Sequence, residues 1–242
     1  IMSDKNSVLI DCGLSCKKLL EKFVEIGFDT QRLSAIFVSH EHSDHISGIR
    51  VVAKKLGVPV YANVMTSQML QSKGRAAEEM TVFENGSQIA IGELVVEPFS
   101  VPHDAVDTVA YCVYKGDQKI TVATDFGFPS QAVQQKLKNS DILLLESNYD
   151  HDMLLDSERP WKLKQRIMGK HGHLSNEQTL EVMDGVLHEN MRYLILGHVS
   201  EHANEYGLVR QLAEKKLAEM NLTDKIELVV ALQNTPSKIF WL

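Results

Sequence analysis

The sequence has few cysteines and no long apolar run, and both absences limit what the protein can be. Cys12, Cys16 and Cys112 are its three cysteines, an odd and sparse set that argues against a disulfide framework and for a reducing compartment. No stretch approaches the roughly 20 apolar residues of a membrane-spanning helix, and no signal-peptide pattern opens the chain. We therefore expect a cytoplasmic protein without a membrane partner.

Internal repeats, low-complexity tracts and Pro- or Gly-rich linkers are also missing, so we expect a single domain over residues 1–242. Hydrophobic residues make up 44% of the chain, enough for a sizeable core. The formal net charge of −7 disfavours a polyanionic partner. Two bound divalent cations would reverse the sign of the charge locally, so a nucleic acid is not excluded.

Short apolar runs alternate with amphipathic segments, which predicts an α/β fold. Strands are expected at residues 7–11, 35–39, 58–62, 141–146, 192–196 and 226–231, with a hairpin at 88–99 and a strand pair at 109–114 and 119–123. Helices are expected at residues 15–26, 46–56, 176–187 and 206–219. Hairpins in the middle and strands alternating with helices at both ends fit two packed sheets covered by helices.

The run His40-Glu-His-Ser-Asp-His45 carries the strongest chemical signal. It directly follows a predicted strand, in a loop position where ligand-binding residues are common. Histidine and carboxylate side chains are the ligands that borderline cations such as Zn²⁺ and Mn²⁺ prefer. His40 and His42 can converge on one ion, and Asp44 and His45 can reach a second. The run therefore predicts a metal-dependent hydrolase with one or two ions.

Other strand ends supply ligands that this loop alone lacks. His103 follows an apolar run, and Asp125 and His198 each end a predicted strand. A single histidine or aspartate at such a place is more often a turn or hydrogen-bonding residue. Their shared placement, together with the run from His40 to His45, favours metal ligation by all of them.

These motifs resemble the metallo-β-lactamase superfamily, whose signature matches His40-x-His-x-Asp-His45. The resemblance implies an αββα four-layer sandwich, with two mixed sheets flanked by helices. An aspartate rather than a cysteine at position 125 is more similar to the phosphodiesterase and nuclease branches than to the antibiotic-hydrolysing one. The resemblance also implies two ligand sets with a bridging carboxylate: His40, His42 and His103 on one ion, Asp44, His45 and His198 on the other, and Asp125 between them.

The sequence is similar over essentially its whole length to the bacterial WalJ/YycJ (VicX) family. Segments 8–15, 38–46, 61–63, 145–150 and 172–176 carry this resemblance. It implies a DNA exonuclease with two divalent metal ions, Zn²⁺ or Mn²⁺, and a metal-bridging hydroxide as the nucleophile. Family members usually begin with a further strand and a Gly/Ser/Asn-rich turn, and we expect that this segment is missing before Ile1.

The residues that would move protons also resemble a known pattern. His173 lies in Gly172-His-Leu-Ser-Asn176, which is similar to the Gly-His-Ser-Thr motif of tRNase Z enzymes, and Glu146 falls where their orienting glutamate lies. A hydrogen bond from the His173 imidazole to the Glu146 carboxylate would raise the pKa of that imidazole and favour a protonated donor. Asp44 would orient the hydroxide. The alternative interpretation makes His173 a capping residue of the helix that follows.

A cationic segment precedes His173. Its members are Arg159, Lys162, Lys164, Arg166 and Lys170, with Trp161 among them. Such a run is usually a solvated helix face. Because this one adjoins the proposed acid, Lys162, Lys164 and Arg166 are candidates for contacts with backbone phosphates, and Trp161 for stacking on a terminal base.

Other functions fit the same ligands. The substrate could be a small phosphodiester, a cyclic nucleotide or a thioester, or the protein could be an RNA-processing nuclease. A regulatory metal-binding protein is the non-enzymatic alternative, and the complete ligand set argues against it. The sequence leaves open the metal, the direction of digestion and the oligomeric state.

Overall fold

The computed structural model describes residues 1–242, and the chain divides into two compact units. Unit 1 comprises Ile1–Ser100 and Ala105–Gly116, and unit 2 comprises Val101–Asp104 and Asp117–Leu242. Each unit has strands and helices of its own. The single domain expected over residues 1–242 stays a prediction.

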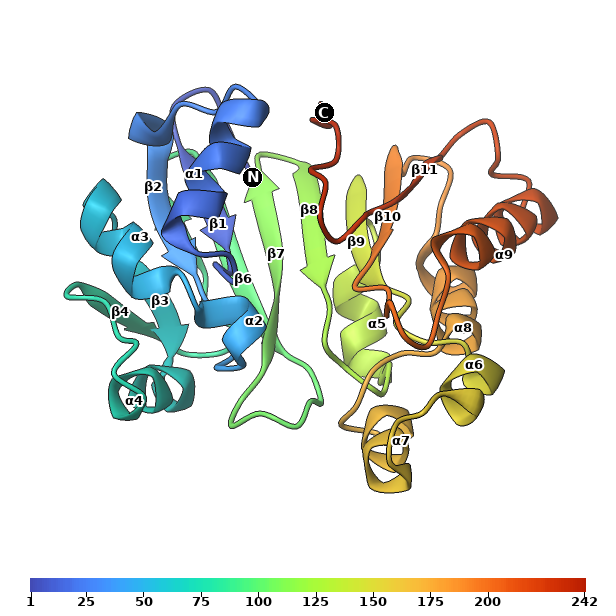
Figure 1. Ribbon diagram of the computed structural model, residues 1–242. Helices are drawn as coiled ribbons and strands as arrows, with labels where there is room; N and C mark the ends of the chain where they lie inside the picture. Colours follow the sequence, from blue (N-terminus) through green and yellow to red (C-terminus); the bar gives the residue numbers. More distant parts are fainter. The chain divides into compact units, whose positions relative to one another are not determined.

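Unit 1 contains a parallel sheet in the strand order β1-β2-β3-β4. Its strands are β1 (Ser7–Ile10), β2 (Leu33–Phe37), β3 (Val60–Asn63) and β4 (Met80–Phe83). The connections hold α1 (Cys16–Glu25), the 3-10 turn Thr30–Arg32, α2 (Ser43–Ile46), α3 (Ile49–Leu56) and α4 (Val64–Ser72). Phe23 of α1 and Val52 of α3 pack with Ile36 and Val60, so these two helices cover one face of the sheet (Figure 1).

The other face of this sheet packs against an antiparallel meander. It consists of β5 (Ile89–Ile91), β6 (Leu94–Ser100) and β7 (Val109–Lys115). Phe37 and Val8 of the parallel sheet share a buried cluster with Val96 and Tyr111 of the meander. The Tyr111 hydroxyl also donates to the carbonyl of Val38 at 2.5 Å, which satisfies its one buried polar group. Unit 1 therefore has a helical layer and two sheet layers.

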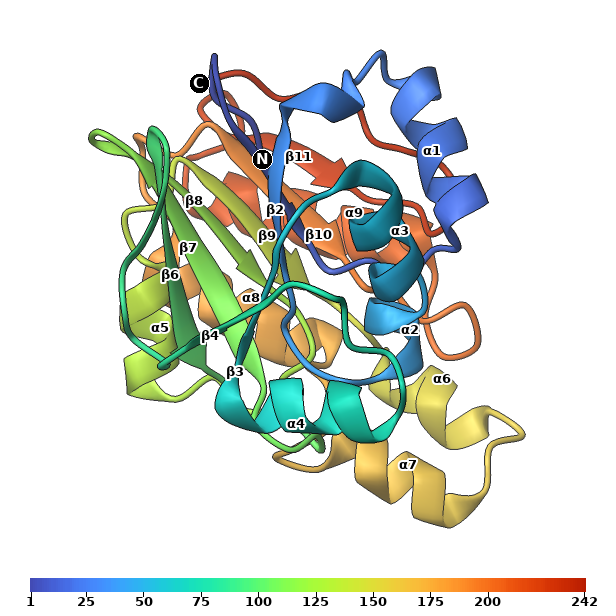
Figure 2. The ribbon, with the colours of Figure 1, turned by 90° about the vertical axis from the view of Figure 1, so that its left-hand side faces the viewer.

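Unit 2 contains parallel strands in the order β11-β10-β9-β8. They are β8 (Gln118–Ala123), β9 (Ile142–Glu146), β10 (Tyr193–Gly197) and β11 (Glu227–Val230). Helices α5 (Gln131–Leu137), α8 (Asn176–Val186) and α9 (Tyr206–Glu219) pack beside one another on these strands. Helices α6 (His151–Asp156) and α7 (Trp161–Met168) lie side by side in the connection between β9 and α8 (Figure 2).

The chain direction brings functional side chains to common edges. Because parallel strands end at the same edge of a sheet, Asp125, Glu146 and His198 meet beyond β8, β9 and β10. Asp125 and His198 have positive φ angles of 59° and 54°. That conformation is uncommon for residues other than glycine and persists where surrounding contacts hold it.

Most of the expected helices and strands are confirmed, but the helix expected at 46–56 is wrong in one respect. The helix begins at Ile49 as α3, and Ser47 and Gly48 separate it from the short helix α2, which covers Ser43–Ile46. The Gly48 N–H donates to the carbonyl of Cys12 at 2.8 Å. A Cβ at Gly48 would lie 2.1 Å from the carbonyl oxygen of Leu14, so this break accommodates the close approach of the loop after β1. Helices α2, α4, α5, α6 and α7 and strand β4 were not predicted.

Candidate metal centre

In unit 1, the histidine loop after β2 is held by Asp11, the residue after β1. Asp11 Oδ1 accepts the backbone N–H of Ser39 at 2.7 Å, and Oδ2 accepts the Ser39 hydroxyl at 2.7 Å. The same Oδ2 lies 2.8 Å from Nδ1 of His45. This contact orients the His45 ring and directs Nε2 towards ligation.

The imidazoles of the loop lie close together. The ring centroid of His40 is 4.6 Å from that of His42 and 4.1 Å from that of His45. His40 is fully buried, and its Nδ1 lies 2.9 Å from the Ser39 hydroxyl. Asp44, in contrast, exposes 66% of its side chain, with Oδ2 at 3.5 Å from Nε2 of His45. A cluster of nitrogen donors beside an accessible carboxylate suits a borderline divalent cation.

Backbone contacts with the chain after β1 also hold the histidine loop in place. The Cys12 N–H donates to the carbonyl of His45 at 2.7 Å. A Cβ at Gly13 would stand 1.4 Å from the carbonyl oxygen of Asp44, so no larger residue fits there without moving the loop. The chain after β1 thus packs directly against the histidine loop and supports it.

In unit 2, the carboxylate of Glu146 is the centre of a second cluster. Glu146 is fully buried at the end of β9. Its oxygens accept three backbone N–H groups, those of Asp125 at 3.2 Å, Phe126 at 3.2 Å and Leu174 at 2.8 Å. These bonds attach the loop after β8 and the loop before α8 to the same carboxylate.

Glu146 also orients two histidines. Its Oε2 lies 3.1 Å from Nδ1 of His173 and 2.7 Å from Nδ1 of His198. Burial opposes ionisation, but the charges and hydrogen bonds of His173 and His198 outweigh it and lower the pKa of Glu146 to about 2. Burial likewise opposes the charged form of His173, but the carboxylate of Glu146 prevails and raises the pKa of that imidazole.

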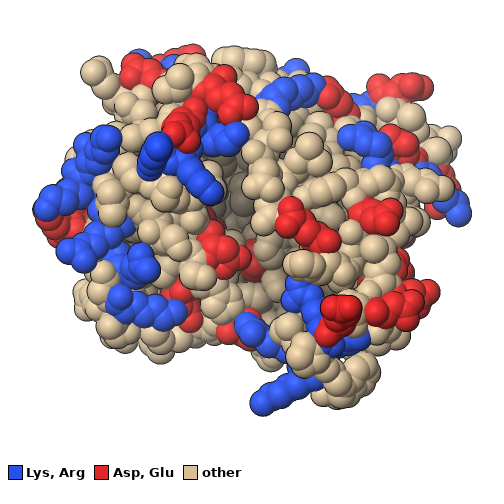
Figure 3. All heavy atoms as spheres, viewed as in Figure 1, with Lys and Arg blue, Asp and Glu red and all other residues tan.

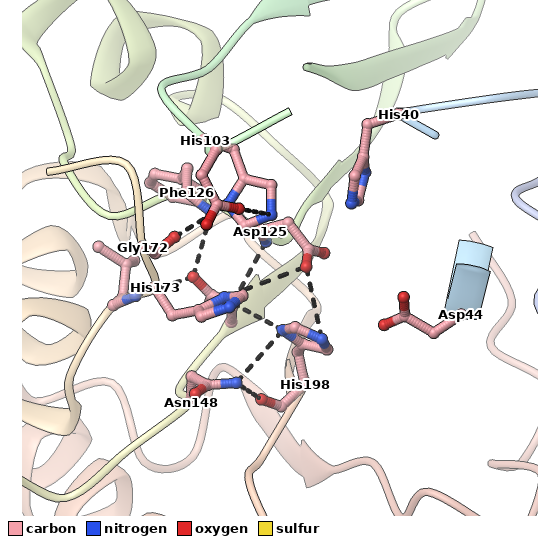
Figure 4. Close-up of polar contacts among 12 residues, drawn as sticks. His40, Asp44, His103, Asp125, Phe126, Asn148, Gly172, His173 and His198 are labelled. Carbon is pink, nitrogen blue, oxygen red and sulfur yellow. Dashed lines mark hydrogen bonds and ion pairs between the residues drawn. The ribbon is translucent and has the colours of Figure 1, made fainter. Parts of the chain in front are cut away.

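Asp125 also lies near both rings. Its Oδ1 is 3.5 Å from Nε2 of His198 and 4.0 Å from Nδ1 of His173. Figure 4 shows the ring of His198 between Asn148 and Asp125, with contacts to both. Asp125, Glu146, His173 and His198 offer ligand atoms within 4.8 Å of one another, a donor set that could hold a cation.

His103 is oriented by the backbone. Its Nδ1 lies 3.0 Å from the carbonyl oxygen of Gly172, and its Nε2 lies 3.4 Å from Oδ1 of Asp104. Burial lowers the pKa of His103 and favours the neutral imidazole that ligates metals. Asp104 also forms an ion pair with Arg166 of α7.

The four rings oriented in this way share one feature. In each, Nδ1 has a hydrogen-bonding partner, so that Nε2 is the nitrogen directed towards ligation, as is usual for metal-binding histidines. The rings and partners are His40 with Ser39, His45 with Asp11, His103 with Gly172, and His198 with Glu146. These residues fit a bound divalent metal.

Two interpretations from the sequence need correction. Ser175 caps α8 in a capping box with Gln178, at 3.2 and 2.9 Å, so the capping interpretation of His173 is wrong. Lys164 is buried, and its Nζ donates to the carbonyls of Leu155 at 2.5 Å and Ser157 at 2.6 Å. Lys164 therefore closes the end of α6 and is not presented to a phosphate.

The remaining members of the cationic segment differ in their surroundings. Trp161 exposes 59% of its surface, and Lys162 is also exposed. Arg166 forms an ion pair with the carboxylate of Asp104 and exposes 57% of its side chain. Asp11 was missed as a site residue, although its position at the end of the strand before β2 matches the placement of the other site residues.

The sequence matches the profile of a family described as the beta-lactamase superfamily domain, over residues 6–198. It is 36% identical over 224 residues to exodeoxyribonuclease WalJ of Streptococcus pneumoniae, covering 91% of this chain and 83% of that protein. It is 32% identical over 219 residues to exodeoxyribonuclease YycJ of Bacillus anthracis, covering 90% and 83%.

Solved structures share the fold at lower identity. The metallo-beta-lactamase fold protein YhfI from Bacillus subtilis superimposes with a TM-score of 0.70 at 18% identity, covering 95% of this chain and 86% of that one. The short form of human tRNase Z gives a TM-score of 0.62 at 14% identity, covering 96% and 87%. The predicted fold class, an α/β fold with two sheets flanked by helices, is confirmed. The expectation that both sheets are mixed is wrong for the sheet β1-β2-β3-β4, in which every pair of strands is parallel. No helix in the structure has the length and apolar character needed to cross a membrane.

Proposed function

We propose that this chain, which belongs to the metallo-β-lactamase superfamily and within it to the WalJ/YycJ family, is a two-metal exonuclease that degrades DNA. The protein is a metal-dependent nuclease, and its substrate class is nucleic acid. The preference for DNA, the number of metals and the exonuclease mode are our proposal. This proposal is supported by the names of the two relatives.

We also propose that the protein works in the reducing cytoplasm, which its three free cysteines support.

The proposed ligands follow the family motifs and the orientation of the rings. We assign His40, His42 and His103 to one ion, Asp44, His45 and His198 to the other, and Asp125 to both. Zn²⁺ and Mn²⁺ both suit these nitrogen and oxygen donors. When bound, such ions supply Lewis-acid activation of water and of the phosphodiester.

Glu146 and His173 give the site its phosphodiesterase character, and their contact is the observation that carries the proposal. The carboxylate holds Nδ1 of His173 at 3.1 Å and raises the pKa of the ring. Nε2 is then the nitrogen that would donate a proton to the departing oxygen of the cleaved linkage. Asp44, exposed at the start of α2, would orient the attacking water.

Contacts with the substrate are proposed for the exposed members of α7. Lys162 and Arg166 would meet backbone phosphates, and Trp161 would stack on a terminal base. Lys164 is left out of this set because both of its carbonyl contacts lie inside the fold.

The test is a nuclease assay with the metal-loaded protein on end-labelled single- and double-stranded DNA and RNA, in Mn²⁺ and in Zn²⁺. We expect nucleotides to be released from the ends of DNA, and the Asp44→Ala variant to be inactive. Cleavage of RNA alone would make the protein an RNA-processing enzyme. Hydrolysis of bis-p-nitrophenyl phosphate without cleavage of either polymer would indicate a small phosphodiester, and metal binding without any hydrolysis a regulatory protein.

A further inference from the structure

One long segment of unit 1 has no acidic residue. Residues 45–77 contain no Asp or Glu, in a chain whose formal net charge is −7. Their five cationic side chains are all exposed: Arg50, Lys54, Lys55, Lys73 and Arg75. Because these cations are divided between α3 and the turn after α4, their proximity emerges only in the folded chain.

The fold brings two of these cations against the chain at and just after the histidine loop, and a third bonds to the turn that carries them. Lys73 Nζ donates to the carbonyl of Glu41 at 3.1 Å, inside the run from His40 to His45. Arg75 donates to the carbonyl of Ser47 at 3.5 Å, and Arg50 donates to that of Gly74 at 3.3 Å. The turn that carries Lys73 and Arg75 is thereby held against the loop.

The same surface is visibly basic. Figure 3 shows Lys and Arg side chains gathered over the part of unit 1 where α3 and α4 lie in Figure 1. The acidic neighbours are Glu78 and Glu79, which follow the turn, and Glu41 and Asp44 in the loop itself; the Glu41 carboxylate accepts the backbone N–H of Val106. Glu78 forms an ion pair with Lys54 at 2.8 Å. Arg50, Lys73 and Arg75 donate to backbone carbonyls, although, after the larger effect of Lys54, the charge of Arg50 also helps to lower the pKa of Glu78.

We infer that Arg50, Lys73 and Arg75 bind the phosphate backbone of the nucleic acid next to the linkage that is cleaved. This inference rests on the proposed function. A guanidinium has five N–H donors and an ammonium three, so each side chain keeps donors for a phosphate after its contact with a carbonyl. The carbonyl contacts also order the side chains before the substrate arrives, which lowers the entropic cost of binding.

The position of these three cations next to the histidine loop favours nucleic acid over other anionic partners. Two of the three carbonyls belong to residues 41 and 47, which flank the proposed ligands His42, Asp44 and His45. A backbone held there would have a phosphate beside the ligands. An anionic membrane or an acidic protein would gain nothing from that location.

The test compares two variants of equal charge. The first, Arg50→Gln with Lys73→Gln and Arg75→Gln, removes the charges but keeps a polar N–H donor at each position. The control, Arg210→Gln with Lys215→Gln and Lys225→Gln, removes three exposed cations that pair with Glu214, Glu219 and Glu189. Binding of the metal-loaded proteins to phosphorothioate DNA, which resists hydrolysis, is measured as a function of salt concentration.

We expect the first variant to bind DNA about 10-fold or more weakly, and the slope of log affinity against log salt to become shallower by about 2 to 3. The control should keep the wild-type slope. An unchanged slope in the first variant would overturn the inference, and so would a variant that loses binding to phosphatidylglycerol vesicles but not to DNA. If the triple variant does not fold, the single variant Lys73→Gln decides, with an expected change in slope of about 1.

Two further readouts separate this inference from the proposed function. Metal content and hydrolysis of bis-p-nitrophenyl phosphate should be unchanged in the first variant, because the small ester has no extended backbone. Loss of both would mean that these cations serve only to hold the loop, which contradicts the inference. If the wild type degrades DNA while the variant keeps its slope, the inference fails and the proposed function stands. If the wild type binds DNA through these cations but hydrolyses nothing, the proposed function fails instead.

Discussion

The Oε2 atom of Glu146 lies 2.7 Å from Nδ1 of His198, and the same oxygen also holds Nδ1 of His173 at 3.1 Å. One buried carboxylate oxygen therefore orients both a proposed metal ligand and the proposed general acid. The two roles are joined at Glu146, which lies at the carboxyl end of β9.

Replacing Glu146 by Gln should weaken both roles. The amide would bring N–H donors into a place where three backbone N–H groups and two rings now meet oxygen, and the attraction to both rings would fall. We expect a loss of about 10- to 100-fold in metal affinity or in activity. Competition with a coloured chelator measures the metal affinity, and hydrolysis of bis-p-nitrophenyl phosphate measures the activity. Glu177→Gln, at an exposed position of α8, is the control, and wild-type values in both assays would refute the assignment.

Replacing His173 by Ala should separate proton donation from metal binding. We expect turnover on DNA to fall by about 10² to 10⁴-fold, because the departing oxygen loses its proton donor. The metal content should stay that of the wild type, because His173 is not among the proposed ligands.

The leaving group provides the decisive comparison for His173. p-Nitrophenolate departs without a proton, so the His173→Ala variant should lose much less activity on bis-p-nitrophenyl phosphate than on DNA. His171→Ala changes an exposed neighbouring histidine and should be close to wild type on both substrates. Equal losses on DNA and on the nitrophenyl ester would exclude His173 as the acid.

Replacing Asp11 by Asn should lower metal affinity without unfolding the protein. Asp11 fixes the His45 ring at 2.8 Å and receives two bonds from Ser39, and an amide reproduces only part of this arrangement. We expect about 10- to 100-fold weaker metal binding. Metal titration and a thermal melt test this together, with the exposed Asp4→Asn as the control. Tight binding in the Asn variant would show that Ser39 alone suffices to hold the loop.

Part of this site was predictable because it obeys rules that are local in sequence. Asp125 and His198 follow strands that run parallel in one sheet, so the parallel arrangement was enough to bring these two ligands to one edge. The histidine run and His103 were found because each directly follows an apolar strand. Ser175 and Gln178 form a capping box that is also local, although His173 was the residue interpreted as a possible cap of this helix.

The missed features depend on contacts between distant segments. Asp11 and Ser39 are 28 positions apart, and nothing near Asp11 in the sequence indicates its partner. Arg75 reaches the carbonyl of Ser47, and Arg50 that of Gly74, only because the chain turns back after β3 and α4. Periodicity alone also fails to tell which lysine of α7 is exposed, because the carbonyls that receive Lys164 belong to the end of α6 and the turn after it.

The two lysines of α7 should accordingly give opposite results. Lys164→Met leaves the buried carbonyls of Leu155 and Ser157 without their donor, and we expect the free energy of unfolding to fall by about 2 kcal/mol or more. The salt dependence of DNA binding should be unchanged. Lys162→Met changes an exposed residue, so stability should be that of the wild type while the slope against log salt becomes shallower by about 1. Urea unfolding and salt-dependent binding of both variants measure the difference. If the Lys164→Met protein is as stable as the wild type and its log affinity depends less steeply on log salt, then Lys164 contacts the substrate, and the structural role assigned to it is excluded.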